Sequence, residues 1–403
     1  MEASLSLQAE SLIARLAMRC SKNDDFGSMS SSIYDTAWLA MIKKPDGQEW
    51  LFPECFDFIL KCQQPLGDWD SYSTSMDGIL NTAASLLALR KHLEESPGNV
   101  DWVARSIKAE RILGRMLDSL DVNNADQATF GILIIKHVEL LRDHGIILKS
   151  RKLEDLRKFR EMKLAMLSPT SVYDTPSTLY YSLEALIGHI DYDKISRWRE
   201  PNGSMMGSPS STAAYLMYAS SWDSSAETYL RNVLKFGYGN GDGGVPSAFP
   251  SSLFETAWTV STLLGAGFHI AEDEARTVGT FLQQALELKG VVGFAPGSYP
   301  DADDAAKTLI TLRSLGYSPS ADGLLAFETQ SHFTTYPKER YPSFSTNCHV
   351  LSALLKSSDP VRYVSQIHKA TVYLTSRALA SRWGDKWVRG LLHMSQSQQI
   401  YLH

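Results

Sequence analysis

One pattern of helix start recurs along this chain. A Ser, Thr, Asp or Asn stands beside small residues, and apolar side chains then follow at helical spacing, as in an N-capped amphipathic helix. The pattern begins near residues 34, 80, 210, 254, 303 and 345. Glycine- and proline-rich stretches separate the helices, and several intervals are about 35–50 residues, the length of a helical hairpin with its loops.

Such hairpins bury their apolar faces only by stacking on one another, as an open solenoid or as a closed ring. Inner helices rich in Ala, Ser and Thr allow close packing around a centre and favour the ring. We therefore predict an all-α protein built of α/α barrels.

Composition narrows the function classes. The chain has 403 residues, of which 44% are hydrophobic and 21% charged, which is typical of a folded globular protein. A net charge of −6 argues against binding to nucleic acid or to an anionic membrane. The four scattered cysteines suit a reducing compartment, and no apolar stretch approaches the roughly 18 residues of a membrane span. The expected location is the cytoplasm.

Residues 300–308, "PDADDAAKT", crowd three aspartates into four positions at a predicted helix start. Three interpretations are open. Carboxylates favour helix N-termini, so the aspartates could simply cap the helix. Clustered carboxylates also suit hard cations, which makes Asp301 and Asp303 weak candidates for metal ligands. Finally, crowding and burial together raise a carboxyl pKa, so the cluster could hold a proton for general acid catalysis.

The wider sequence resembles the class II diterpene cyclases, most closely the copalyl diphosphate synthase-like enzymes of fungi. Asp301–Asp304 is similar to the DxDD acid motif of that family, and "SIYDTAW" at 32–38 to its SxYDTAW signature. Further similar stretches follow in the same order, among them "LYYSLEAL", "GSPSSTAAYLMY" and "GGVPSAFPSSLFETAW". The resemblance covers roughly residues 30–387.

The resemblance implies two α/α barrels, called β and γ, with the active site between them. On this interpretation residues 1–45 are an N-terminal segment of the β domain and 46–235 are the γ domain. The β domain then resumes over 236–403, carries the DxDD motif and ends in a divergent tail at 388–403.

The resemblance also implies the chemistry. The expected reaction is cyclisation of geranylgeranyl diphosphate to a copalyl-type bicyclic diphosphate, an isomerisation in which the diphosphate stays attached. Asp303 is then the proton donor, and Asp301 and Asp304 tune and orient it. Asn347 stands where the family places an asparagine that hydrogen-bonds the acid. A neutral alkene is a very weak base, so the donor must be strongly activated and water must be excluded.

The remaining expectations concern the substrate. Lys163 occupies the position of a diphosphate-binding lysine, and magnesium is expected to assist that binding. Tyr181 and Ser247 match the pair that holds the water acting as final base in plant relatives. Aromatic side chains are candidates to line the cavity and stabilise cations through their ring faces. These candidates are Trp38, Tyr180, Tyr181, Phe249, Trp258 and Phe344. A separate class I synthase is the expected consumer of the product.

The final residues depart from the family. After "RWGDKW" at 382–387 the chain reads "VRGLLHMSQSQQIYLH", which the family pattern does not contain. The tail predicts a C-terminally truncated chain with an incomplete β barrel and impaired activity. Two hypotheses therefore stand: a class II cyclase, or a truncated non-catalytic helical scaffold.

Overall fold

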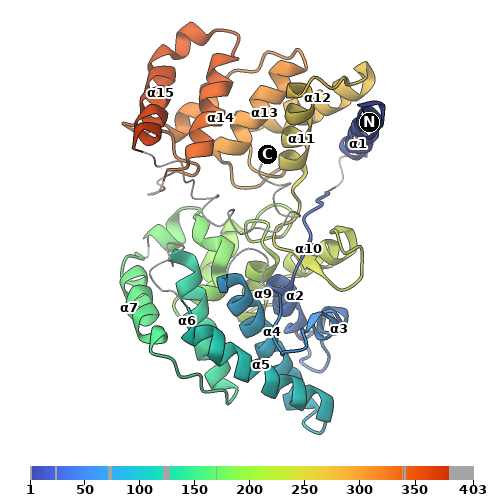
Figure 1. Ribbon diagram of the computed structural model, residues 1–403, viewed down its shortest axis with the longest axis vertical. Helices are drawn as coiled ribbons and strands as arrows, with labels where there is room; N and C mark the ends of the chain where they lie inside the picture. Colours follow the sequence, from blue (N-terminus) through green and yellow to red (C-terminus); the bar gives the residue numbers. More distant parts are fainter. Residues whose placement is uncertain are drawn as a thin grey trace. The chain divides into compact units, whose positions relative to one another are not determined.

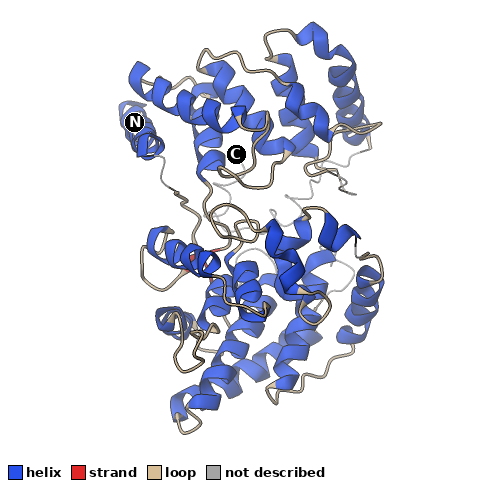
Figure 2. Cartoon of the chain, turned by 180° about the vertical axis from the view of Figure 1, so that it is seen from behind, coloured by secondary structure: helices blue, strands red, loops and turns tan. Residues whose placement is uncertain are grey.

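Helices make up almost all the regular structure of this protein, as the computed structural model shows (Figure 2). The structure describes residues 2–22, 25–70, 75–120, 128–168, 170–337, 339 and 342–380. Within that part the extended structure is one antiparallel pair of two-residue strands, β1 (Ser31–Ser32) and β2 (Val245–Pro246), besides isolated bridges. The all-α prediction is confirmed. None of the described helices is long and apolar enough to cross a membrane.

The chain forms two compact units, and the first unit takes both ends of the described sequence. It runs through Gly27 and resumes at Pro250. Its α-helices are α1 (Glu2–Lys22), α11 (Ser252–Gly265), α12 (Glu272–Glu287), α13 (Ala302–Ser314), α14 (Phe344–Leu355) and α15 (Val364–Leu379). Two short 3₁₀ helices, η5 (Asp322–Phe327) and η6 (Pro360–Tyr363), connect the later helices.

Alternate helices of the first unit form an inner row. α13 packs against α11 on one side and α14 on the other, while α12 packs on α1 and α15 packs on α14 (Figure 1). α13 is the most enclosed, because its small residues Ala302, Ala305 and Ala306 let the neighbouring helices approach closely. The residues at the N-terminus of α13, among them Asp301, Ala302 and Asp304, are buried as well.

The second unit spans Ser28–Phe249. Its α-helices are α2 (Ile33–Ala40), α3 (Pro53–Cys62), α4 (Ser75–Glu95), α5 (Val100–Asp118), α6 (Ala128–Asp143), α7 (Lys152–Leu164), α8 (Tyr192–Ile195), α9 (Pro209–Tyr218) and α10 (Ser224–Phe236). It also holds η2 (Thr170–Asp174), η3 (Thr178–Leu186) and η4 (Ser196–Trp198).

The helices of the second unit close into a ring. α2 packs on α4, α4 on α6, α6 on η3, η3 on α9, and α9 again on α2. α3, α5, α7 and α10 each pack on one of these inner elements from outside. This is the layered arrangement of an α/α barrel, and the predicted closed ring is observed here.

The units correct the predicted domain boundaries. The helix of the SxYDTAW signature, α2, was assigned with residues 1–45 to the β domain, but it is part of the ring of the second unit. Nearly all of α2 is buried there, and β1 before it pairs with β2. The second unit also extends past 235, because the Phe249 carbonyl accepts a hydrogen bond from Tyr229 Oη. The predicted tail at 388–403 and the "RWGDKW" stretch lie outside the described residues.

These boundaries can be tested with fragments. A fragment of residues 28–249 contains every member of the ring, so we expect it to fold and to unfold cooperatively on its own. A fragment of residues 46–235 lacks α2 and β2, which leaves the facing sides of α4 and α9 exposed. Thermal melts followed by circular dichroism should show a cooperative transition for the first fragment only. Equal stability of the two would contradict the observed boundaries.

Candidate active site

Asp301 caps the helix that carries the aspartate cluster. Its Oδ1 accepts hydrogen bonds from the backbone N–H groups of Asp303 (2.9 Å) and Asp304 (2.8 Å). The side chain is also buried, with 3% of the residue exposed. Burial raises the pKa of Asp301 to about 7, although the hydrogen bonds at the helix start oppose the rise. The capping interpretation is thus correct for Asp301, and the same residue also holds a proton more tightly than an ordinary aspartate.

Asp304 is buried as well. Only 6% of the residue is exposed. Burial, followed by the negative charges of Asp301 and Asp303, raises the pKa of Asp304 well above its ordinary value. Asp304 Oδ1 and the indole Nε1 of Trp258 both lie buried without a hydrogen-bond partner in the described chain, and the nearby indole partly offsets the rise. Both buried carboxyl groups of the cluster therefore bind a proton more tightly than an ordinary aspartate does.

Asp303 is the most accessible of the three carboxyl groups. Its side chain is 18% exposed, and its Oδ1 lies 2.6 Å from Nδ1 of His349 on α14. The His349 ring in turn meets the Trp258 ring of α11 edge to face, with centroids 4.7 Å apart. Side chains from α13, α14 and α11 thus form one connected group. His349 was not predicted from the sequence.

Asn347 does not occupy the predicted place beside Asp303. Its Nδ2 donates to the carbonyls of Phe333 (2.9 Å) and Ser343 (2.8 Å), and its Oδ1 accepts from the N–H of Phe333 (2.9 Å). Two residues rotate a helix by about 200°, so positions 347 and 349 face different neighbours. Asn347 fastens the preceding loop, and His349 is the partner of the acid. A histidine two positions further along the same predicted helix was the available signal.

Lys307 completes the group on α13. Its Nζ lies over the Trp258 ring, 4.3 Å from the centroid. Burial lowers the pKa of Lys307 to about 8, with Asp303 acting in the opposite direction. The site thus combines three carboxyl groups, an imidazole, an ammonium and an indole within one unit.

The other predicted residues divide between core and surface. Trp38 and Phe249 are each 1% exposed and belong to the core of the second unit, whereas Trp258 and Phe344 are partly exposed in the first. Trp38 packs edge to face on His137, with ring centroids 5.6 Å apart. Trp38 and Phe249 are therefore residues of the hydrophobic core of the second unit.

Tyr181 and Ser247 are brought together in the second unit, but through the backbone. Tyr181 Oη donates to the Ser247 carbonyl at 3.1 Å, and both residues are exposed. Lys163 lies in the last turn of α7, in the same unit, with its Nζ 5.3 Å from the centroid of the Phe159 ring.

The SxYDTAW signature builds a second buried acidic group. Glu184 of η3 is 1% exposed and accepts hydrogen bonds from Tyr34 Oη (3.0 Å) and Ser211 Oγ (3.1 Å). Ser210 joins it to Asp35, donating its N–H to Asp35 (3.1 Å) and its Oγ to Glu184 (3.3 Å). Burial, then the charge of Asp35, raises the pKa of Glu184 to about 7. The signature thus links α2, η3 and the start of α9.

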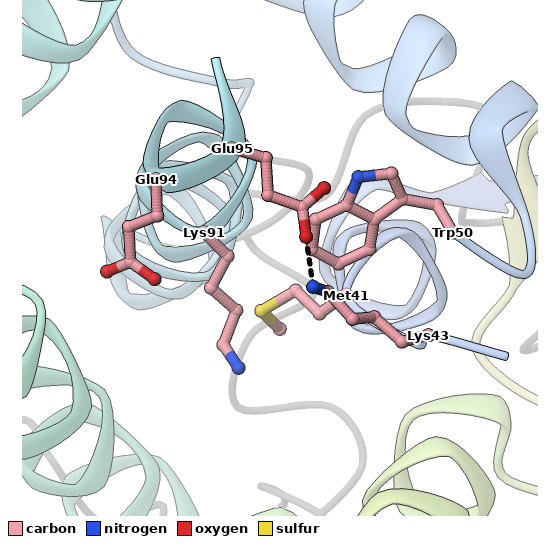
Figure 3. A pocket seen from close by; sticks show the side chains of 6 residues that line it. All are labelled: Met41, Lys43, Trp50, Lys91, Glu94 and Glu95. Carbon is pink, nitrogen blue, oxygen red and sulfur yellow. Dashed lines mark hydrogen bonds and ion pairs between the residues drawn. The ribbon is translucent and has the colours of Figure 1, made fainter. Parts of the chain in front are cut away.

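A surface pocket of about 240 Å³ lies elsewhere in the second unit (Figure 3). Its lining residues are Met41, Lys43, Trp50, Lys91, Glu94 and Glu95. Lys43 pairs with Glu95 across it, as the dashed line shows, and Glu94 pairs with His144. This charged lining is unlike an apolar cavity for a hydrocarbon chain, and it contains none of the predicted site residues.

The aspartate cluster does not fit a metal ion on its own. Among the described residues there is no group of three or more His, Cys, Asp or Glu side chains arranged to hold a metal. Asp301, one of the two weak candidates, already binds two backbone N–H groups, and Asp303 binds His349. We therefore derive no step through a metal at these residues.

Sequence comparison finds relatives among fungal diterpene synthases. The chain is 40% identical over 413 residues to a pimaradiene synthase of Emericella nidulans, covering 95% of this chain and 42% of that protein. It is 41% identical over 396 residues to a copalyl diphosphate synthase of Talaromyces verruculosus, covering 95% of this chain and 41% of that protein. The chain thus spans about two fifths of the length of these curated relatives. No family model matches it.

Structure comparison finds plant enzymes. Abietadiene synthase from Abies grandis superposes with a TM-score of 0.76 at 26% identity, covering 93% of this chain and 48% of that one. The ent-copalyl diphosphate synthase from Arabidopsis thaliana, in complex with an aza analogue of geranylgeranyl thiolodiphosphate, gives 0.76 at 25% identity, covering 94% and 54%.

The buried Glu184 should make stability depend on pH. Its pKa is about 7 in the folded protein and 4.5 in a model peptide, so the folded state binds the proton more tightly. This contribution to stability is complete below pH 4.5 and is lost as the pH rises through about 7, a change of about 3 kcal/mol. Asp35, whose pKa burial also raises, contributes with the same sign.

Glu184→Gln cannot ionise, so its melting temperature should fall less between pH 5 and pH 8 than that of the wild type. Scanning calorimetry at both values measures this, with the exposed Glu110→Gln on α5 as the matched control. Parallel pH dependences in the wild type and Glu184→Gln would show that Glu184 does not titrate in this range.

Proposed function

This chain is a relative of the fungal diterpene synthases and has the fold of the class II diterpene cyclases, and on that premise we propose that it cyclises geranylgeranyl diphosphate by protonation. The proposed product is a copalyl-type bicyclic diphosphate. Two similar proteins support the substrate class: one relative is a copalyl diphosphate synthase, and one structural neighbour was solved with an analogue of geranylgeranyl diphosphate.

The observation that carries the proposal is the state of the carboxyl cluster. Protonating an alkene requires a strong acid in a site with little water. Asp301 and Asp304 are buried with raised pKa values, while Asp303 alone is partly exposed and has a directional partner in His349. The contact with His349 engages Oδ1 of Asp303, so we place the acid proton on the other carboxyl oxygen, where a substrate can take it.

The proposed reaction conserves atoms and charge. The Asp303 carboxyl transfers its proton to the terminal alkene, which leaves a carbocation on the neighbouring carbon. The electron pairs of the next two alkenes close two rings in turn, and the final cation loses a proton to a base. One proton enters and one leaves, so the reaction is an isomerisation, and the C–O bond to the diphosphate stays intact.

The proposed roles of the other residues follow from their settings. Trp258 and Phe344, both partly exposed in the unit of the acid, are the better candidates to stabilise cations. Lys163 remains the proposed diphosphate ligand, and Tyr181 with Ser247 the proposed holders of the water that acts as base. Magnesium assistance, a cytoplasmic location and a separate class I synthase that consumes the product also remain predictions.

The alternative is a non-catalytic scaffold. Burying carboxyl groups with raised pKa values lowers stability, so a non-catalytic scaffold would gain nothing from two of them. The intact arrangement of Asp301, Asp303, Asp304 and His349 therefore favours the enzyme.

Asp303→Asn should abolish cyclisation. Asparagine keeps the volume and the helix-start preference of aspartate but cannot act as a Brønsted acid, so turnover should fall by at least about a hundredfold. The assay is incubation with geranylgeranyl diphosphate, phosphatase treatment and product analysis. Asp273→Asn, in the exposed first turn of α12, is the matched control and should retain activity. A cyclising Asp303→Asn enzyme would disprove the assignment.

His349→Phe should slow the reaction without unfolding the protein. It removes one hydrogen bond to the acid, which corresponds to about a 10- to 150-fold loss in turnover. His368→Phe, exposed on α15, is the control. Unchanged turnover in His349→Phe would mean that the 2.6 Å contact has no part in proton donation.

A further inference from the structure

Asp303 and Lys307 stand four residues apart on α13, with the acid on the N-terminal side. That spacing and order place opposite charges on the same face of a helix and favour an ion pair between them. The two side chains do not pair in this structure. Asp303 is bound by His349, and the Lys307 ammonium lies over the Trp258 ring.

Trp258 is placed to cause this separation. Trp258 projects from α11, which packs along α13. Its ring contacts both Lys307 and His349. One contact is with the Lys307 ammonium, 4.3 Å from the ring centroid and well within cation–π range. The other is with the edge-to-face imidazole of His349, 4.7 Å between centroids. The indole therefore lies between the basic group that binds Asp303 and the basic group that does not.

The separation matters for an acid catalyst. An ammonium paired directly with Asp303 would stabilise its carboxylate, the form that has already lost the proton. Lys307 remains positively charged at neutral pH, because its pKa is about 8. The charged groups that act on it are Asp303, which raises that pKa, and Lys356 at the end of α14, which lowers it. Among the described residues, the negative group that acts on the Lys307 pKa is thus the acid itself.

We propose that Trp258 is a positioning residue that holds the Lys307 ammonium on its ring face and so prevents Lys307 from pairing with Asp303 and stabilising its carboxylate form. The inference rests on the proposed function of Asp303 as the proton donor. It gives Trp258 a role beyond lining a cavity, and it gives Lys307 the role of a charge that must be kept apart from the acid.

A second-site rescue tests the proposal. Trp258→Leu removes the ring face, so Lys307 can pair with Asp303, and turnover should fall by about a hundredfold or more, the scale of general acid catalysis. Removing the ammonium as well, in Trp258→Leu/Lys307→Met, should restore most of the lost turnover. If the double variant is as slow as Trp258→Leu, the ring matters only as a wall or through its N–H, and the proposal is wrong.

Matched variants separate the ring face from the indole N–H. Trp258→Phe keeps an aromatic face but loses the N–H group near Asp304, so it should be clearly faster than Trp258→Leu. Lys307→Met alone should be clearly faster than Trp258→Leu, because no ammonium is left to pair with Asp303. Equal loss in the Phe and Leu variants, or an inactive Lys307→Met, would overturn the proposal. If Trp258→Leu does not fold, Trp258→Met replaces it, since methionine fills irregular space well.

One measurement does not depend on turnover. The ¹³Cε resonance of Lys307, assigned by its loss in Lys307→Met, should titrate near pH 8 in the wild type and at a clearly higher pH in Trp258→Leu, where the carboxylate stabilises the ammonium. An unchanged titration would contradict the proposal. A wild-type protein that shows this response but does not cyclise geranylgeranyl diphosphate would refute the proposed function and leave the positioning by Trp258 intact.

Discussion

The burial of carboxyl groups at the start of α13 is the constraint on which the first unit depends. A buried carboxylate is costly unless it is hydrogen-bonded, paired or protonated, and this unit uses all three solutions within four residues. Asp301 is bound by the backbone of its own helix, and Asp303 is paired with His349. Asp304 holds its proton tightly, because burial and the charges of Asp301 and Asp303 raise its pKa. The small residues of α13 make this burial possible, because they let α11 and α14 close over the helix start.

The second unit also buries carboxyl groups, but there they connect structural elements. Glu184 and Asp35 are buried where the ring closes, and hydroxyl groups from three segments satisfy them. A carboxyl group placed there binds its proton until about pH 7. The SxYDTAW signature therefore has a structural reason of its own: its tyrosine and aspartate connect α2 to η3 and α9. Its tryptophan fills the core behind them.

The surroundings of Asp303 show how tertiary contacts select among local possibilities. Within α13 alone, Lys307 is the natural partner of Asp303. The neighbouring helices replace that pairing, α14 by supplying an imidazole at 2.6 Å and α11 by supplying a ring for the ammonium. A hydrogen-bonded imidazole can exchange a proton with the acid, whereas a paired ammonium would hold the acid in its ionised form. The chemistry proposed for the site depends on that replacement.

The sequence by itself determined the features that short-range physics controls. Helix periodicity predicted the all-α architecture, and Asp301 was recognisable as a cap because its hydrogen bonds reach only two and three residues along the chain. The signature motifs, read together, identified the relatives. Tertiary structure alone decided which residues meet across the chain. It moved α2 into the second unit, made His349 and not Asn347 the partner of Asp303, and turned Trp38 and Phe249 into core. The contact between Asp303 and His349, for example, joins residues 46 positions apart. Such contacts are set by the way helices pack on one another, which no local sequence pattern encodes.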